Sequence, residues 1–168
     1  MRGYLFARTG EPANAIQMIN SGIAVYQSTG STMSTPVTLS YLASAYAQLG
    51  QSVDAWRCIG EAMTAMETTK EKWFEAEVHR FAGEIVLTSP EPDATRVEAY
   101  FERALSIARE QQAKSWELRA AMSMARVWRD QGKREQAHDL LAPVYGWFTE
   151  GFDTLDLKQA KALLDELR

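Results

Sequence analysis

Apolar residues recur along the chain with the period of an α-helix. In the clearest segments a small or aliphatic side chain returns at positions i, i+4 and i+7, as in Ala55, Ile59 and Ala62. Side chains with this spacing lie on one face of a helix, whereas a half-buried strand would alternate apolar and polar residues. We therefore predict no strand. We expect helices over residues 1–9, 12–28, 34–49, 52–69, 72–88, 94–111, 115–131 and 134–149, with a last helix over 155–167.

The apolar pattern also repeats over a much longer interval. The segment LASAYAQLG, which begins at Leu42, has its small and large residues at the same spacing as MARVWRDQG, which begins at Met124. Gly132 follows Gly50 by two intervals of about 41 residues. Between these units lies a more diverged one, and a further unit begins before Gly10. The second helix of each unit carries an apolar stripe. The four stripes are Ala15-Ile19-Gly22, Ala55-Ile59-Ala62, Val97-Phe101-Ala104 and Ala137-Leu141-Val144.

The repeated residues have a packing role. Small residues at Ala43, Gly83 and Ala125 allow two helix backbones to approach, and the large residue three positions later fills the adjacent space. Gly50 and Gly132 are expected to end helices, because glycine adopts the left-handed C-cap conformation without a Cβ penalty. The residues suited to N-caps are Ser52, Asp93 and either Asp153 or Thr154.

These features predict one domain of stacked antiparallel helix pairs. The repeated unit resembles a tetratricopeptide repeat (TPR), with a period near 40 residues in place of the usual 34. The resemblance implies an all-α fold of the α-α superhelix class, in which each pair completes the apolar contacts of the next. The expected repeats cover residues 1–29, 33–70, 72–112 and 114–150, and a capping helix covers 154–168.

A closer likeness is carried by four segments. They are WFEAEVHR at 73–80, FERALSIAR at 101–109, the run 111–134 and LLAPVYGWFTEGFDT at 140–154. With them, residues 30–168 resemble the C-terminal TPR region of bacterial class III adenylate/guanylate cyclase proteins that also carry an AAA-type ATPase module. In that family the repeats follow the enzymatic domains and are regarded as regulatory or scaffolding parts. The resemblance implies a fragment or a relative of that C-terminal region.

No catalytic residue is carried over from this family. The chain has no Gly-x-x-x-x-Gly-Lys-Ser/Thr phosphate loop and no evident pair of metal-binding aspartates in a strand context. His79 and His138 have no Cys or His at i+3 or i+4, so we expect no metal site and no cofactor. Cys58 has no neighbouring histidine to activate it and is expected to behave as a small, semi-buried hydrophobic residue.

Charge and composition exclude further classes of protein. The 168 residues have a net charge of −4, which argues against a nucleic-acid surface because phosphate binding needs a basic excess. No stretch is apolar enough for a membrane span, and the first residues lack the apolar core of a secretory signal. A single cysteine cannot form an internal disulfide. We therefore expect a cytoplasmic location.

The first helix of each pair should line a concave surface. The pair expected over 34–49 and 52–69 contributes only Val37, Ser40, Ser44 and Gln48 to this surface, whereas the two following pairs contribute charged residues, mainly arginines. The groove is therefore predicted to turn basic toward its C-terminal end and to bind a protein or peptide, notably an acidic one, since arginine presents paired donors to a carboxylate. The alternative is a solvated face with weak Glu–Arg pairs. The candidate partner-binding residues are Glu77, Arg80, Glu84, Arg119, Met122, Arg126 and Arg129.

The aromatic residues are interpreted as core. Phe74 and Trp116 begin successive first helices in matching register, and Trp73 precedes the first of them. Aromatic side chains at equivalent repeat positions usually fill the same space between helices. The same interpretation applies to Trp56, Trp128 and Trp147.

The sequence thus favours a non-catalytic interaction or regulatory module that is not an enzyme. One alternative is a working part of a nucleotide cyclase whose catalytic domain lies outside this chain. A second alternative is self-association into a homo-oligomer. In that case the shortened first unit would leave Leu5, Phe6, Ile16 and Ile19 short of packing partners, so that another copy could dock there.

Overall fold

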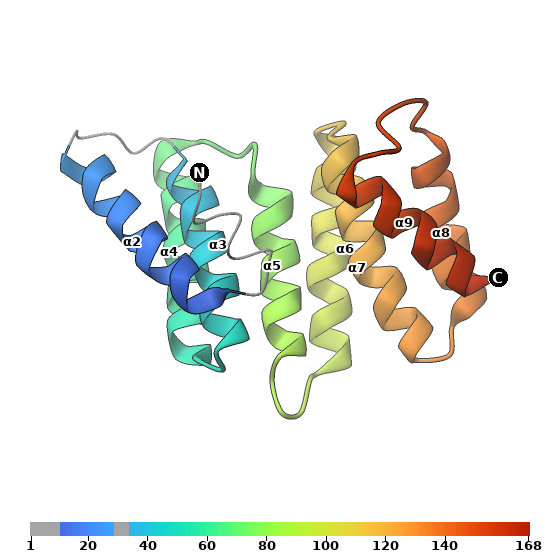
Figure 1. Cartoon of the computed structure of the whole chain (residues 1–168), viewed down its shortest axis with the longest axis horizontal. Coiled ribbons are helices and arrows are strands. Elements are labelled where there is room, and N and C mark those ends of the chain that lie inside the picture. The colour runs from blue at the N-terminus through green and yellow to red at the C-terminus, as the bar shows by residue number, and fades with distance from the viewer. Residues whose placement is uncertain (1–10, 29–33) are drawn as a thin grey trace.

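The computed structural model describes residues 11–28 and 34–168 of the chain. Within that part the protein is all-helical, with eight helices and no strand (Figure 1). None of these helices is both long and apolar enough to cross a membrane. The helices are α2 (Pro12–Ser28), α3 (Thr35–Gln48), α4 (Ser52–Thr69), α5 (Glu75–Leu87), α6 (Ala94–Glu110), α7 (Lys114–Asp130), α8 (Arg134–Gly146) and α9 (Leu155–Leu167).

The predicted helices agree closely with these bounds. Helices α2, α4 and α9 begin and end at the predicted residues, and the predicted helix over 1–9 lies outside the described residues. Two ends differ by three residues. Helix α5 begins late because Lys70 takes a left-handed φ of 62° and the Glu75 amide donates to the Lys72 carbonyl in a turn. Helix α8 stops at Gly146 rather than at residue 149.

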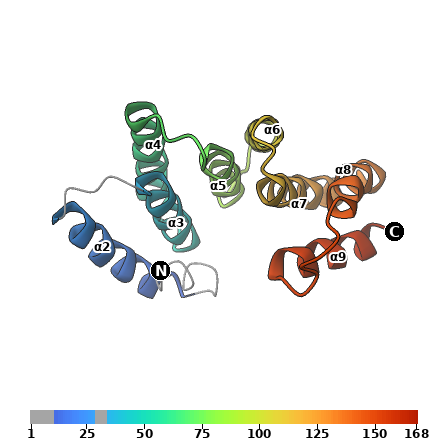
Figure 2. The ribbon, with the colours of Figure 1, turned by 90° about the horizontal axis from the view of Figure 1, so that it is seen from above.

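Neighbouring helices pack as pairs. Helix α3 packs on α4, α5 on α6, and α7 on α8, an arrangement compatible with a helical repeat. Seen from above, α3, α5 and α7 form the inner side of a curved row and α4, α6 and α8 the outer side (Figure 2). Helix α9 packs on both α7 and α8. Helices α2 and α9 both lie on the inner side of the curve, at its two opposite ends.

Two of the helix ends use the same turn. Gly50 and Gly132 have positive φ values of 72° and 81°, which confirms the predicted C-terminal glycines. In each turn the amide after the glycine donates to a carbonyl in the last helical turn, as in a Schellman motif. The two bonds join the Gln51 amide to the Tyr46 carbonyl (2.9 Å) and the Lys133 amide to the Trp128 carbonyl (2.8 Å). Tyr46 and Trp128 therefore occupy corresponding positions.

Only one predicted N-cap forms the expected bond. The Asp93 carboxylate accepts a hydrogen bond from the Arg96 amide at 3.1 Å. Ser52 is the first helical residue rather than the N-cap, so this assignment was wrong by one position. Thr154 is the N-cap of α9, but its hydroxyl donates to the Gly151 carbonyl at 2.7 Å and accepts nothing from the helix.

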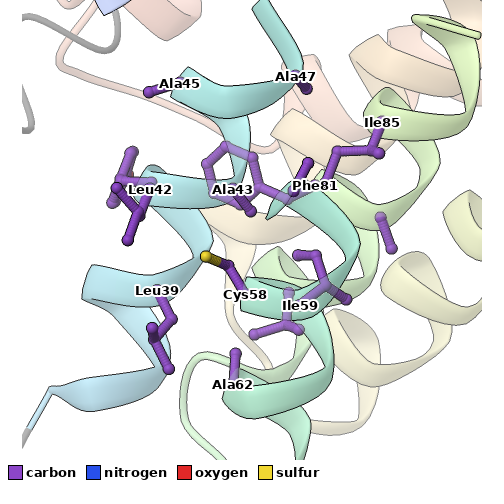
Figure 3. Close-up of a cluster of buried hydrophobic side chains, with 14 of the residues drawn as sticks. Leu39, Leu42, Ala43, Ala45, Ala47, Cys58, Ile59, Ala62, Phe81 and Ile85 are labelled. Atoms are coloured by element: carbon purple, nitrogen blue, oxygen red, sulfur yellow. The ribbon is translucent and has the colours of Figure 1, made fainter. Parts of the chain in front are cut away.

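The predicted stripes form the core, except that Gly22 of the first stripe is exposed. Ile59, Phe101 and Leu141, which share one register position in α4, α6 and α8, are at most 1% exposed. Figure 3 shows the part of the core where side chains of α3, α4 and α5 meet around Cys58 and Ile59. Cys58 is fully buried rather than semi-buried, and burial raises the pKa of its thiol to about 11.

Two tryptophans assigned to the core are instead exposed. Trp73 is 51% exposed because it lies in the turn before α5, where the adjacent Phe74 takes the inter-helix position. The Phe74 ring packs edge-on against Trp116, with the ring centroids 5.4 Å apart. Trp147 is 58% exposed because α8 ends one residue before it.

Candidate functional site

A hollow of about 250 Å³ opens on the inner side of the curved row. Four consecutive inner helices contribute to it, so segments far apart in the sequence form one surface. We call it the concave hollow. Its lining residues are Tyr41, Ser44 and Gln48 from α3; Arg80, Phe81 and Glu84 from α5; Arg119, Met122, Ser123 and Arg126 from α7; and Leu155, Asp156 and Gln159 from α9.

The helical period explains why these side chains converge. Residues three, four and seven positions apart share one helix face, so Arg80 and Glu84 of α5 point the same way, as do Arg119 and Arg126 of α7. The two faces meet side by side, because the Ser123 hydroxyl donates to the Glu84 carboxylate at 3.2 Å. Ser44 and Gln48 were predicted on this surface, and both line the hollow. Ser40 and Val37 were predicted there too, but Ser40 is fully buried and Val37 packs against the core.

A buried carboxylate lies beneath the floor of the hollow. Glu77 is fully buried, and its carboxylate accepts from Arg80 Nε at 2.6 Å, from Arg80 Nη2 at 3.1 Å and from Arg119 Nη1 at 3.2 Å. Arg80 also pairs with Glu84. Burial by itself would lower the pKa of Arg80, but the Glu84 and Glu77 carboxylates outweigh it and raise that pKa. Arg80 is thus held charged and fully paired.

Arg119 joins the same network to the last helix. Its side chain reaches Asp156 of α9 at 2.7 Å in addition to Glu77. Burial opposes the charge, yet the Glu77 and Asp156 carboxylates raise the pKa of Arg119 above its ordinary value. Asp156 was not among the residues predicted for this surface, although it neutralises one of the predicted arginines.

Arg129 lies outside the concave hollow. Its guanidinium contacts the Glu166 carboxylate of α9 at 2.6 Å and the neighbouring Asp130 at 2.9 Å. Residues predicted together are thus divided by the structure. Arg80, Glu84, Arg119, Met122 and Arg126 line the hollow, Glu77 lies beneath it, and Arg129 pairs at the end of α7.

Arg126 differs from the other arginines of this face. It is half-buried in the wall of the hollow, yet it forms no hydrogen bond or ion pair with another residue in the described part of the chain. Burial lowers the pKa of its guanidinium, Glu84 raises it in part, and the like charges of Arg80 and Arg129 lower it further. An anion at this position would offset the cost of burying the guanidinium and would counter the like-charge repulsion.

Of the three arginines that line the concave hollow, only Arg126 therefore lacks a carboxylate partner in the described part of the chain. The carboxylates of Glu77, Glu84 and Asp156 balance the paired arginines within residues 34–168. Among the described residues there is also no group of three His, Cys, Asp or Glu side chains that could hold a metal ion. The hollow offers one positive site surrounded by hydroxyl, amide and thioether groups.

Comparison with known proteins identifies no family. No protein-family model matches the chain, and no curated protein matches it.

Proposed function

We propose that this chain is a non-catalytic, TPR-like helical-repeat module that binds an acidic protein segment in the concave hollow. The resemblance to the C-terminal region of bacterial cyclase–ATPase–TPR proteins adds a regulatory role in signalling and a cytoplasmic location to this proposal. Stacked helix pairs with a curved inner face commonly serve as extended binding surfaces.

The observation that carries this proposal is the unpaired guanidinium of Arg126. A half-buried cation without a carboxylate partner is costly in an unbound protein, and a bound carboxylate removes that cost while accepting two parallel hydrogen bonds. The neighbouring Ser44, Gln48 and Gln159 side chains surround such a ligand with further polar groups. The arginines that are already paired serve to hold α5, α7 and α9 in register around it.

Selection of peptides tests this proposal. The purified chain is immobilised and used to enrich binders from a fully random displayed peptide library, and the binders are then measured against the Arg126→Gln variant. We expect the binders to contain Asp or Glu and to lose about tenfold or more in affinity, because a charge-assisted hydrogen bond is removed. Unaltered circular dichroism of the variant shows that it remains folded.

The matched control is Arg57→Gln on the outer helix α4. Arg57 is about half exposed, and among the described residues it pairs only with Asp54 and Glu61 of its own helix. This variant is expected to bind the selected peptides as the wild type does. Failure to enrich any peptide, or equal binding by Arg126→Gln, would remove the concave hollow as the binding site.

A further inference from the structure

A second hollow, of about 540 Å³, opens beside the concave hollow. It lies between the N-terminal end of α7, the connection 147–154 and the start of α9. Its apolar walls are the side chains of Trp116, Leu118, Phe148 and Leu157. We call it the apolar hollow. Its volume falls in the range of about 300–1,000 Å³ that is usual for ligand pockets.

Trp116 gives this hollow a fixed wall. Its indole packs edge-on against the buried Phe74, and the guanidinium carbon of Arg119 lies 5.0 Å from the indole ring. Because Arg119 is itself tied to Glu77 and Asp156, the indole is held between two immobilised side chains. Such a preformed aromatic wall favours a bulky apolar side chain, which loses little ordering entropy on entering.

The two hollows are parts of one surface. Arg119 and Asp156 line both of them, so the ion pair between these residues forms the boundary from one hollow to the other. A ligand bound at Arg126 therefore needs to pass only this boundary to reach the apolar hollow. Because the two hollows are continuous, we favour a single extended ligand over two unrelated ligands.

The length of helix α7 between Trp116 and Arg126 gives the distance between the two hollows. Trp116 and Arg126 stand on the same helix, and a rise of 1.5 Å per residue separates their backbones by about 15 Å. An extended peptide advances roughly 3.3–3.6 Å per residue, so about four residues cover this distance. The ligand can follow the helix axis in either direction, which leaves the order of its two anchoring residues open.

We propose that the partner is an extended peptide segment that places a carboxylate at Arg126 and a bulky apolar side chain in the apolar hollow, about four residues away. This inference rests on the proposed function and adds the second anchor and the spacing to it. Charge complementarity fixes the first anchor. The apolar walls and their shared boundary with the concave hollow fix the second.

The test uses a peptide library in which one central aspartate is fixed and all other positions are random. Selection on the full chain is expected to enrich Trp, Phe, Leu or Met about three to five residues from the aspartate, on one side of it. The selected peptides are then measured against Ser115→Trp, because Ser115 is exposed on the rim and an indole there fills the apolar hollow. We expect at least about a tenfold loss of affinity.

The control is Ser106→Trp, which adds the same indole to an exposed position of the outer helix α6. It should bind the peptides like the wild type. Enrichment without an apolar residue at this spacing, or equal binding by Ser115→Trp, overturns the second anchor, while continued dependence on Arg126 leaves the proposed function standing. Loss of the Arg126 dependence, or the absence of any binder, overturns both.

Discussion

At Gly83 the absence of a side chain allows a residue of the next helix to pack against the backbone of α5. A Cβ atom added to it would lie 2.6 Å from Cε1 of Phe101, whose ring is fully buried. The ring of α6 therefore packs directly on the backbone of α5. The small residues Ala43 and Ala125 stand at the equivalent positions of α3 and α7, and both are completely buried.

Substitution of Gly83 by alanine should destabilise the fold. Alanine favours a helix by about 1 kcal/mol over glycine, but displacing a packed aromatic ring costs about 1–3 kcal/mol. We therefore expect a lower midpoint in chemical denaturation. The control is Gly60→Ala in α4, where nothing lies within 4 Å of the added Cβ, and here the midpoint should rise. A stabilised Gly83→Ala protein would show that the ring moves aside freely.

Arg126 and Arg80 show how neighbouring residues of one type acquire different roles. Arg80 already pairs with Glu77 and Glu84, so its positive charge is balanced within the protein. Arg126 stands further along the face without such a partner. Both residues are arginines. An arginine with carboxylates nearby stabilises the fold, whereas one without them is available to bind a ligand.

At the scale of the helices, buried ion pairs connect the inner row. The Glu77 carboxylate joins α5 to α7, and Arg119 continues the connection from α7 to Asp156 of α9. Arg129 and Glu166 form a second contact between α7 and α9. The curvature of the inner face therefore depends on polar contacts as well as on the apolar stripes.

Removal of the Glu77 carboxylate should show how much the buried ion pairs contribute to stability. Glu77→Ala leaves the guanidinium groups of Arg80 and Arg119 without their shared acceptor in a buried site, and we expect a loss of about 3–5 kcal/mol in the free energy of unfolding. Denaturation by urea measures this loss. The control is Glu61→Ala in α4, whose pair with Arg57 is exposed to solvent and contributes little to stability. Equal effects of the two variants would contradict a buried network.

The sequence predicted the helices well because their apolar stripes are local. Ile59, Phe101 and Leu141 recur at matching positions, and a stripe of this kind is visible within a few turns of one helix. The ends were less predictable where a turn depends on backbone conformation. Lys70 adopts a left-handed φ without being glycine, and nothing in its side chain indicates this.

The candidate site was predicted only in part. The helical period was sufficient to place Arg80, Arg119 and Arg126 on one face. The Asp156 partner of Arg119 was missed because α9 was interpreted as a cap over the end of the stack, whereas α9 lies on the inner side of the curved row and its Asp156 pairs with Arg119. The irregular connection 147–154 interrupts the repeat, so the spacing that related the earlier helices could not be extended to α9.

At the scale of the whole molecule, the curved row gathers four helices around one hollow while its outer helices face away (Figure 2). The net charge of −4 means that an acidic partner is not attracted from a distance. Recognition must therefore come from the local field at Arg126 and from apolar contact. We expect binding that is specific in position but modest in its rate of association.

We propose the inner face of α3, α5, α7 and α9 as the binding surface. The most direct measurement follows the backbone amide resonances of the isotope-labelled chain while a selected acidic peptide is added. The largest shifts are expected at residues around the concave hollow, including Ser44, Met122, Arg126 and Gln159. Shifts concentrated on α4, α6 and α8, with the inner helices unchanged, would contradict the account.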